Sequence, residues 1–360
     1  MAWIYMTMLN VYYGTAHAGD DAGIYTQTLE IETGSLGTAS LAAPATSAGF
    51  QAINAAGTLL YSICANDDGK GVVRAYSIER STGALTLINE QLTGGGKPTY
   101  VGLSGTERSL FAVCYGEGSL SVLPVSEDGS IEPYSVFKIH EGGSGAIASR
   151  QGEAHTHSIY TDPTNQYVFV CDLGADKIFI YKFDQDDSVL IGDPIEVATA
   201  VGAGPRHLAF HPNGEWVYVL NELNSTMTQY SWDAAQAGLA EKGTLSTLPE
   251  GFSFEDNLTA EVVVSADGRF VYGSNRGHDS IAVFAINEKD GSLTLTQIEA
   301  TRGGHPRNFN LDPTGNFLVC ANRDSDNVTL FKRDSESGKI EYTGYEVSVP
   351  SGICVSFVSR

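Results

Sequence analysis

The side chains best suited to chemistry lie at the two ends of one predicted hairpin. Residues 204–223 read as two strands joined by a tight Pro-Asn-Gly turn, because apolar runs at 207–210 and 216–220 flank that turn. A hairpin folds back on itself, so Arg206 at its start and Glu222 at its end are predicted neighbours. Such a pair could orient water, bind a carboxylate or stabilise an oxyanion. It could equally be an ion pair that pins two strand ends.

Two histidines alternate in the segment His155-Thr156-His157, near the start of another predicted strand. Alternate residues of a strand share a face, so both imidazoles are expected to point the same way. A histidine there could accept a proton from water at working pH, a contribution typically worth about 10²–10⁴-fold in rate. The alternatives are a capping or core histidine, or half of a metal site. No third ligand at a suitable spacing supports zinc, so we predict no metal. The sequence does not choose between His155 and His157.

These motifs belong to a repeat of about fifty residues. Six units each run through strand, turn, strand and two further strands, with matching turn positions near residues 57, 105, 165, 214, 268 and 315. Four strands at that period are typical of a propeller blade. Residues 353–358 resemble a first strand, and residues 11–43 resemble the three strands that would follow it. The sequence therefore predicts an all-β, seven-bladed β-propeller with four-stranded antiparallel blades. Residues 1–360 would form one domain, and the N- and C-terminal strands would share a blade and close the ring.

Propeller geometry gathers side chains that are distant in the chain. The start of each first strand and the end of each second strand lie on one face of the disc. Around one mouth of the central channel we therefore expect His155, His157, Arg206, Glu222, Arg276, His278, Arg307 and Arg323. Arg276 is the best candidate for clamping a phosphate or carboxylate. Arg307 and Arg323 could equally pair with nearby aspartates, and His278 could instead tie a loop.

Overall charge constrains the ligand. The 360 residues carry a net charge of −22, so neither nucleic acid nor an anionic membrane is an expected partner. An anionic ligand would need locally concentrated basic residues, which this mouth would provide. The segment 1–9 is apolar but short and has no basic lead-in, so we expect neither a signal peptide nor a membrane helix. Four of the five cysteines lie at similar places within strands, which indicates buried thiols and favours the cytoplasm. We expect a monomer or a homodimer.

Several motifs resemble the lactonase family of seven-bladed propellers. They are Gly-Pro-Arg-His-Leu-Ala-Phe-His-Pro-Asn-Gly (204–214), Ser-Asn-Arg-Gly-His-Asp-Ser-Ile-Ala-Val-Phe (274–284), Pro-Arg-Asn-Phe (306–309), Asp-Pro-Thr-Gly (312–315) and Asp-Ser-Asp-Asn-Val (324–328). The family includes bacterial 6-phosphogluconolactonase and the fungal 3-carboxy-cis,cis-muconate lactonising enzyme. The resemblance covers essentially the whole chain and is most specific from residue 155 to residue 332.

This resemblance implies hydrolysis of a small anionic sugar lactone, most concretely 6-phospho-glucono-1,5-lactone, without a cofactor. It also implies that a histidine, arginines and a glutamate act at the matching places. One of the two histidines would activate water with help from Glu222, Arg206 would stabilise the oxyanion, and Arg276 would hold the phosphate. One alternative is a lactonising enzyme that acts on a carboxymuconate. Another is a non-catalytic propeller that binds a protein or metabolite, which would expose an apolar patch on a face of the disc.

Overall fold

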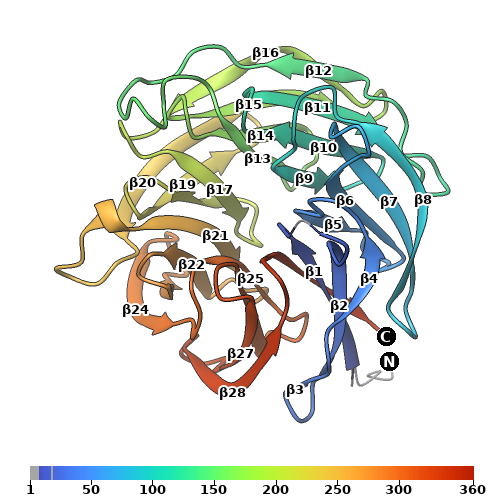
Figure 1. The fold of residues 1–360 in the computed structure, drawn as a ribbon. Coiled ribbons are helices and arrows are strands. Elements are labelled where there is room, and N and C mark those ends of the chain that lie inside the picture. The colour runs from blue at the N-terminus through green and yellow to red at the C-terminus, as the bar shows by residue number, and fades with distance from the viewer. Residues whose placement is uncertain (1–7, 18) are drawn as a thin grey trace.

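The strands form seven sheets arranged in a closed ring around a common centre (Figure 1). The structure is a computed structural model that describes residues 8–17 and 19–360. Within them it contains strands β1 to β29 and one short 3-10 helix, η1 (Phe254–Asp256). All pairings between the strands are antiparallel, so the predicted seven-bladed β-propeller is confirmed.

Six blades are each built from four consecutive strands. The first strands of neighbouring blades contact one another around the ring and line the channel. In chain order, the first two of these blades are β5 (Gln51–Ile53), β6 (Leu59–Ala65), β7 (Gly71–Glu79) and β8 (Ala84–Leu92), and then β9 (Tyr100–Leu103), β10 (Ser109–Cys114), β11 (Ser119–Pro124) and β12 (Val136–Ile139). The next two are β13 (Thr156–Thr161), β14 (Tyr167–Asp172), β15 (Lys177–Asp184) and β16 (Val189–Ala198), and then β17 (Pro205–Phe210), β18 (Trp216–Asn221), β19 (Thr226–Asp233) and β20 (Gly238–Ser246). The last two are β21 (Leu258–Val264), β22 (Phe270–Arg276), β23 (Ser280–Ile286) and β24 (Leu293–Ala300), and then β25 (Pro306–Leu311), β26 (Phe317–Asn322), β27 (Asn327–Arg333) and β28 (Ile340–Ser348).

The seventh blade joins the two ends of the chain, as predicted. Its strands are β29 (Gly352–Ser359), β1 (Met8–Thr15), β2 (Gly23–Glu30) and, both paired with β2, β3 (Ser35–Leu36) and β4 (Ser40–Pro44). The fourth strand is therefore interrupted rather than continuous. Of the segment 1–9, for which we expected neither a signal peptide nor a membrane helix, residues 1–7 lie outside the described residues. Across the described part of the chain, no helix has the length and apolar character needed to span a membrane.

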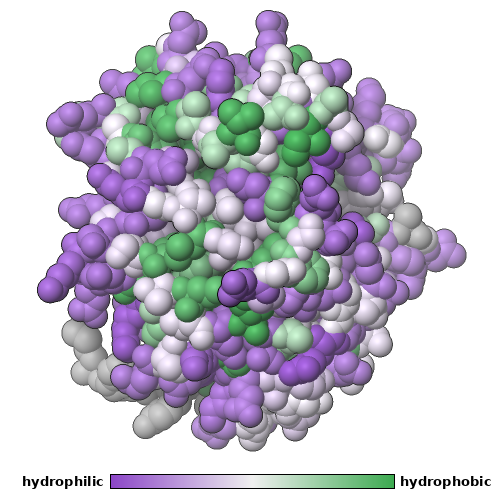
Figure 2. Space-filling view, turned by 90° about the vertical axis from the view of Figure 1, so that its left-hand side faces the viewer, coloured by the Kyte–Doolittle hydropathy of each residue, from purple (hydrophilic) through white to green (hydrophobic). Residues whose placement is uncertain are grey.

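The hydrophobic core lies between the blades. The outermost strand of a blade is the most exposed: in the blade formed by β17 to β20, β18 is almost wholly buried whereas β20 is mostly exposed. One core cluster joins Phe270 and Tyr272 of one blade to Phe309 and Phe331 of the next. All five cysteines are buried and free, as expected from their places within strands. The side of the molecule shown in Figure 2 is mainly hydrophilic, with smaller hydrophobic patches between the charged side chains.

Candidate active site

Irregular pairing occurs near the start of five inner strands, β13, β17, β21, β25 and β29, and in three of them it involves a predicted site residue. The pairing of β13 with β14, of β17 with β18 and of β25 with β26 shifts by one residue near the start of the inner strand. The residues at these shifts are His157, Arg206 and Arg307. A β-bulge leaves one residue outside the ladder and re-aims its side chain. The three side chains consequently come within electrostatic range of one another at one mouth of the channel.

Glu222, which directly follows β18, is the centre of this cluster. Its Oε2 accepts a hydrogen bond from Arg206 Nε at 2.9 Å and forms an ion pair with Arg276 Nη2 at 2.8 Å. Its Oε1 accepts from Arg150 Nη2 at 2.5 Å. The predicted proximity of Arg206 and Glu222 is thus present, and Arg276 joins them from the next blade.

The surrounding charges fix the protonation state of Glu222. Burial disfavours its charged form, but Arg276, Arg206 and Arg150 outweigh that effect and hold the pKa of the carboxyl group well below its usual range. Glu222 is therefore a permanent anion at neutral pH, and it is unsuited to accept a proton. Burial together with the nearby Arg276 lowers the pKa of Arg206 to about 10, so this guanidinium remains charged at neutral pH.

Arg307 differs from the three arginines that contact Glu222, because its side chain forms no hydrogen bond or ion pair with any residue that the structure describes. Burial and the positive charges of Arg206 and Arg276 hold its pKa well below the usual value for arginine. Arg307, Arg323, Lys97 and Tyr115 line a cavity of about 490 Å³ at the channel mouth. A half-buried cation without an ion-pair partner among the described residues, facing a cavity of this size, favours an anionic ligand.

The two histidines occupy different environments. His155 precedes β13, stacks on the Tyr115 ring at a centroid distance of 4.3 Å, and donates from Nδ1 to the Tyr115 carbonyl oxygen at 2.8 Å. His157 is only 4% exposed and meets the Tyr115 ring edge-on. The bulge interrupts the strict alternation from which we expected both rings to point the same way. Burial and then the nearby Arg206 lower the pKa of His157 far below that of a free histidine, so it is neutral at neutral pH.

Two other predicted site residues lie at the edge of the cluster or outside it. Arg323 lines the cavity, but its Nε also pairs with Asp324 Oδ1 at 2.6 Å, which is the alternative pairing considered for it. His278 hydrogen-bonds Ser280 Oγ through Nδ1 at 2.8 Å and packs edge-on against the Phe252 ring, as expected for a residue that ties a loop. Among the described residues, no group of three or more His, Cys, Asp or Glu side chains is arranged to hold a metal ion.

Sequence reasoning missed several members of the cluster. Arg150 lies in a glycine-rich segment between β12 and β13 that has no strand pattern, and nothing in its surroundings indicates a contact with Glu222. Tyr115 follows β10 directly, just as Glu222 follows β18, so its position in the repeat could have identified it. His207 and Glu261 were also missed, although His207 directly follows Arg206 in β17 and Glu261 lies in the first strand of the next blade, β21.

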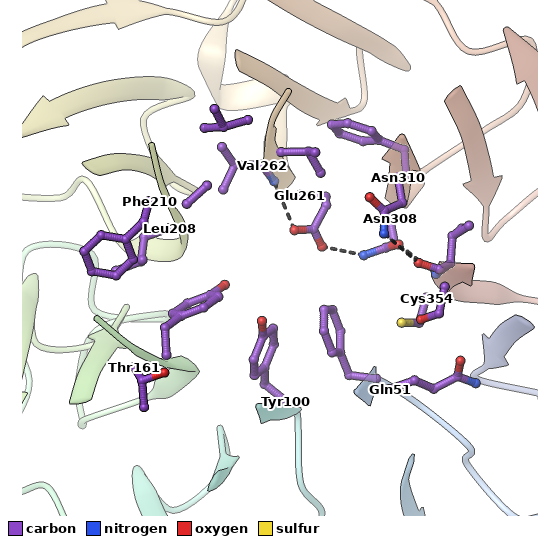
Figure 3. Close-up of a pocket in the computed structure, with 18 residues that line it drawn as sticks. Gln51, Tyr100, Thr161, Leu208, Phe210, Glu261, Val262, Asn308, Asn310 and Cys354 are labelled. Carbon is purple, nitrogen blue, oxygen red and sulfur yellow. Dashed lines mark hydrogen bonds between the residues drawn. The ribbon is translucent and has the colours of Figure 1, made fainter. Parts of the chain in front are cut away.

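A second cavity, of about 370 Å³, lies further along the inner strands toward their turns (Figure 3). Aromatic side chains that include Tyr100 and Phe210 line it, together with Glu261 and Asn308. In the close-up, the carboxylate of Glu261 points toward the middle of the channel and is hydrogen-bonded to the Val262 backbone and the Asn308 side chain. Glu261 also contacts His207, which in turn touches Arg206, so this carboxylate is linked to the arginine cluster.

Comparison with known proteins bears on this site. Residues 10–357 match the model of the family described as "Lactonase, 7-bladed beta-propeller". The chain belongs to this lactonase family. A 6-phosphogluconolactonase of Bacillus subtilis (strain 168) is 37% identical to the chain over 355 residues, which are 99% of this chain and 100% of that protein. A 6-phosphogluconolactonase of Formosa agariphila is 36% identical over 308 residues, or 83% of this chain and 85% of that one.

Solved structures of the lactonase type agree with the sequence relatives. The periplasmic gluconolactonase PpgL of Pseudomonas aeruginosa superposes with a TM-score of 0.91 at 31% sequence identity. The superposition covers 98% of this chain and 99% of that chain. The family resemblance inferred from the sequence motifs is therefore confirmed over nearly the whole propeller.

Proposed function

We propose that this lactonase-family chain hydrolyses 6-phospho-glucono-1,5-lactone to 6-phosphogluconate, as a single-domain enzyme of the pentose phosphate pathway. The observation that carries the proposal is one channel mouth where a neutral buried histidine, an arginine–glutamate cluster and a free guanidinium converge. The relatives named 6-phosphogluconolactonase support the choice of substrate. A cytoplasmic location is part of the proposal and is supported by the five free, buried cysteines.

We assign the proton acceptor to His157 rather than His155, because only His157 lies at the level of Arg206 and Arg307. Its pKa is low mainly through burial and neighbouring guanidinium groups. An anionic substrate would offset those positive charges, so substrate binding would raise the basicity of His157 when it is needed. His155, held by Tyr115, would form the rim of the site.

In the proposed reaction, water attacks the lactone carbonyl carbon while His157 takes its proton. Arg206, oriented by Glu222, stabilises the negative charge that develops on the carbonyl oxygen. The ring carbon–oxygen bond then breaks, and the departing oxygen takes the proton back from His157. The product acid ionises, so each turnover releases one proton to the solvent.

Arg307 replaces Arg276 as the proposed phosphate-binding residue. Arg276 already pairs with Glu222 and donates to the Thr259 carbonyl oxygen at 2.5 Å, whereas Arg307 has no partner among the described residues. A phosphate carries two negative charges and several acceptor oxygens, which suits a guanidinium that has only donors. Arg323 would add to the positive field at the same cavity.

The test follows acid release from freshly generated 6-phosphogluconolactone, with and without the protein. We expect a rate well above spontaneous hydrolysis, lost in R206M and retained in R302M, which removes an exposed arginine paired with Glu299. Parallel assays with gluconolactone and with a carboxymuconate distinguish the related activities. No acceleration with any phosphorylated or free sugar lactone would refute the proposal.

A further inference from the structure

Two buried residues, His207 and Glu261, form a chain of contacts that ends on Arg206. Arg206 Nη1 lies 3.1 Å from His207 Nε2, and His207 Nδ1 lies 3.2 Å from Glu261 Oε1. Exposure is 2% for Arg206, 2% for His207 and 7% for Glu261. Neither a sequence motif nor a step of the proposed reaction accounts for these contacts.

Hydrogen-bond chemistry fixes the tautomer of His207. A guanidinium group has only donors, so Arg206 Nη1 must donate and His207 Nε2 must accept. The proton of the neutral imidazole then sits on Nδ1, from which it is donated to the Glu261 carboxylate. Burial, reinforced by Arg206 and opposed by Glu261, lowers the pKa of His207 to about 4, so the ring is neutral at neutral pH.

Glu261 is itself held by its own strand, β21, and by the neighbouring strand β25. Its Oε1 accepts from the Val262 backbone N–H at 3.2 Å, and its Oε2 accepts from Asn308 Nδ2. Asn308 cannot turn its amide round freely, because its Oδ1 accepts from the Val355 backbone N–H at 2.8 Å. These bonds, drawn in Figure 3, leave Glu261 Oε1 facing His207.

We propose that Glu261 and His207 are positioning residues for Arg206. Glu261 selects the Nδ1–H tautomer of His207, and the Nε2 lone pair of that tautomer holds the guanidinium of Arg206 against the lactone carbonyl. The opposite tautomer would direct an N–H at the N–H groups of Arg206, and two donors cannot bond. His207 also meets the His157 ring edge-on at a centroid distance of 5.2 Å, so the same residue borders both the proposed base and the oxyanion-stabilising group.

The tautomer is read directly from long-range ¹H–¹⁵N spectra of the full chain labelled with ¹⁵N-histidine at pH 7, with H207Q used to assign the signals. We expect His207 to be neutral with its proton on Nδ1. A proton on Nε2, or on both nitrogens, would overturn the proposal. This measurement uses no lactone, so although the positioning role rests on the proposed function, its failure is distinguishable from failure of the lactonase activity.

A double-mutant cycle tests the effect on catalysis. E261Q places an amide N–H against either the Asn308 amide or His207, and N308D places two carboxylates together. In E261Q/N308D the new amide donates to the new carboxylate, which still accepts from Val355, while an acceptor again faces His207. We expect each single substitution to lower kcat about tenfold or more and to change KM less. In the double variant, kcat should recover to within about threefold of the wild-type value.

Two outcomes of the cycle would contradict the positioning role. One is single variants whose kcat equals that of wild type. The other is a double variant that is no more active than either single variant, although the spectrum of the double variant still shows the proton of His207 on Nδ1. If a single variant does not fold, the spectrum of the wild-type protein and the activity of the double variant still decide the question.

Discussion

Replacing Arg307 with Met should stabilise the ligand-free protein and lower its affinity for an anionic substrate. Arg307 is half-buried near Arg206 and Arg276 and has no ion-pair partner among the described residues. At an effective dielectric constant of about 20, two like charges about 8 Å apart repel by roughly 2 kcal/mol. The attraction of the nearby Glu222 and solvent screening at a half-buried site reduce this value, so we expect the free energy of unfolding to rise by about 1 kcal/mol.

The matched variant R276M should have the opposite effect. Arg276 pairs with the buried Glu222 at 2.8 Å, and loss of one partner of a buried ion pair costs about 3–5 kcal/mol. Because Glu222 keeps Arg206 and Arg150, we expect a somewhat smaller loss of about 2–3 kcal/mol. The two arginines are thus predicted to change stability in opposite directions.

Both variants are compared with wild type by urea unfolding in a buffer free of phosphate, and then by steady-state kinetics. If Arg307 binds the phosphate by charge-assisted hydrogen bonds worth about 1.5–3 kcal/mol, R307M should raise KM for the phosphorylated lactone about 10- to 150-fold. KM for unphosphorylated gluconolactone should change little. An R307M protein that is less stable than wild type, with an unchanged KM for the phosphorylated lactone, would refute this account of the cluster.

Further predictions concern four other residues of the site. H157Q should lower kcat about 10²–10⁴-fold, measured by acid release, whereas H155Q should cost less than about tenfold; equal losses would contradict the choice of base. E222Q should lower the free energy of unfolding at pH 7 by about 3 kcal/mol. Because the folded-state pKa of Glu222 is depressed, its contribution is present above the unfolded pKa of about 4.3 and is lost as pH falls below it. The stability gap between E222Q and wild type should therefore narrow between pH 5 and pH 3 in urea titrations, and a constant gap would argue against the assignment. R150M removes a partly exposed partner of Glu222 and should cost about 1 kcal/mol of stability in the same titrations, with KM raised more than kcat is lowered.

Features that depend on repetition could be read from the sequence. The recurring turns gave the number of blades, and the unmatched strands at the two ends gave the closure of the ring. The contact between Arg206 and Glu222 followed from the geometry of a single hairpin. These inferences succeeded because strand pairing and turn chemistry are local and are reflected in the residue pattern.

Features that depend on exceptions to the repeat pattern could not be predicted from the sequence. The bulges at His157, Arg206 and Arg307 are shifts of one residue, and no glycine or proline at the bulged position marks them. Arg150 reaches Glu222 from a long connection whose path is set by tertiary contacts. The sequence also favoured Arg276 as the phosphate clamp, since it could not reveal that Glu222 would attract three arginines and leave Arg307 free.

The shared seventh blade has a consequence for how the protein folds during its synthesis on the ribosome. Val355 of β29 donates to Asn308, and Asn308 holds Glu261, from which the contacts continue through His207 to Arg206. The ribosome makes β29 after the other strands that the structure describes, so a nascent chain with six finished blades lacks this contact to Asn308. If Glu261 and His207 position Arg206 as proposed, closure of the ring is then a condition for full activity.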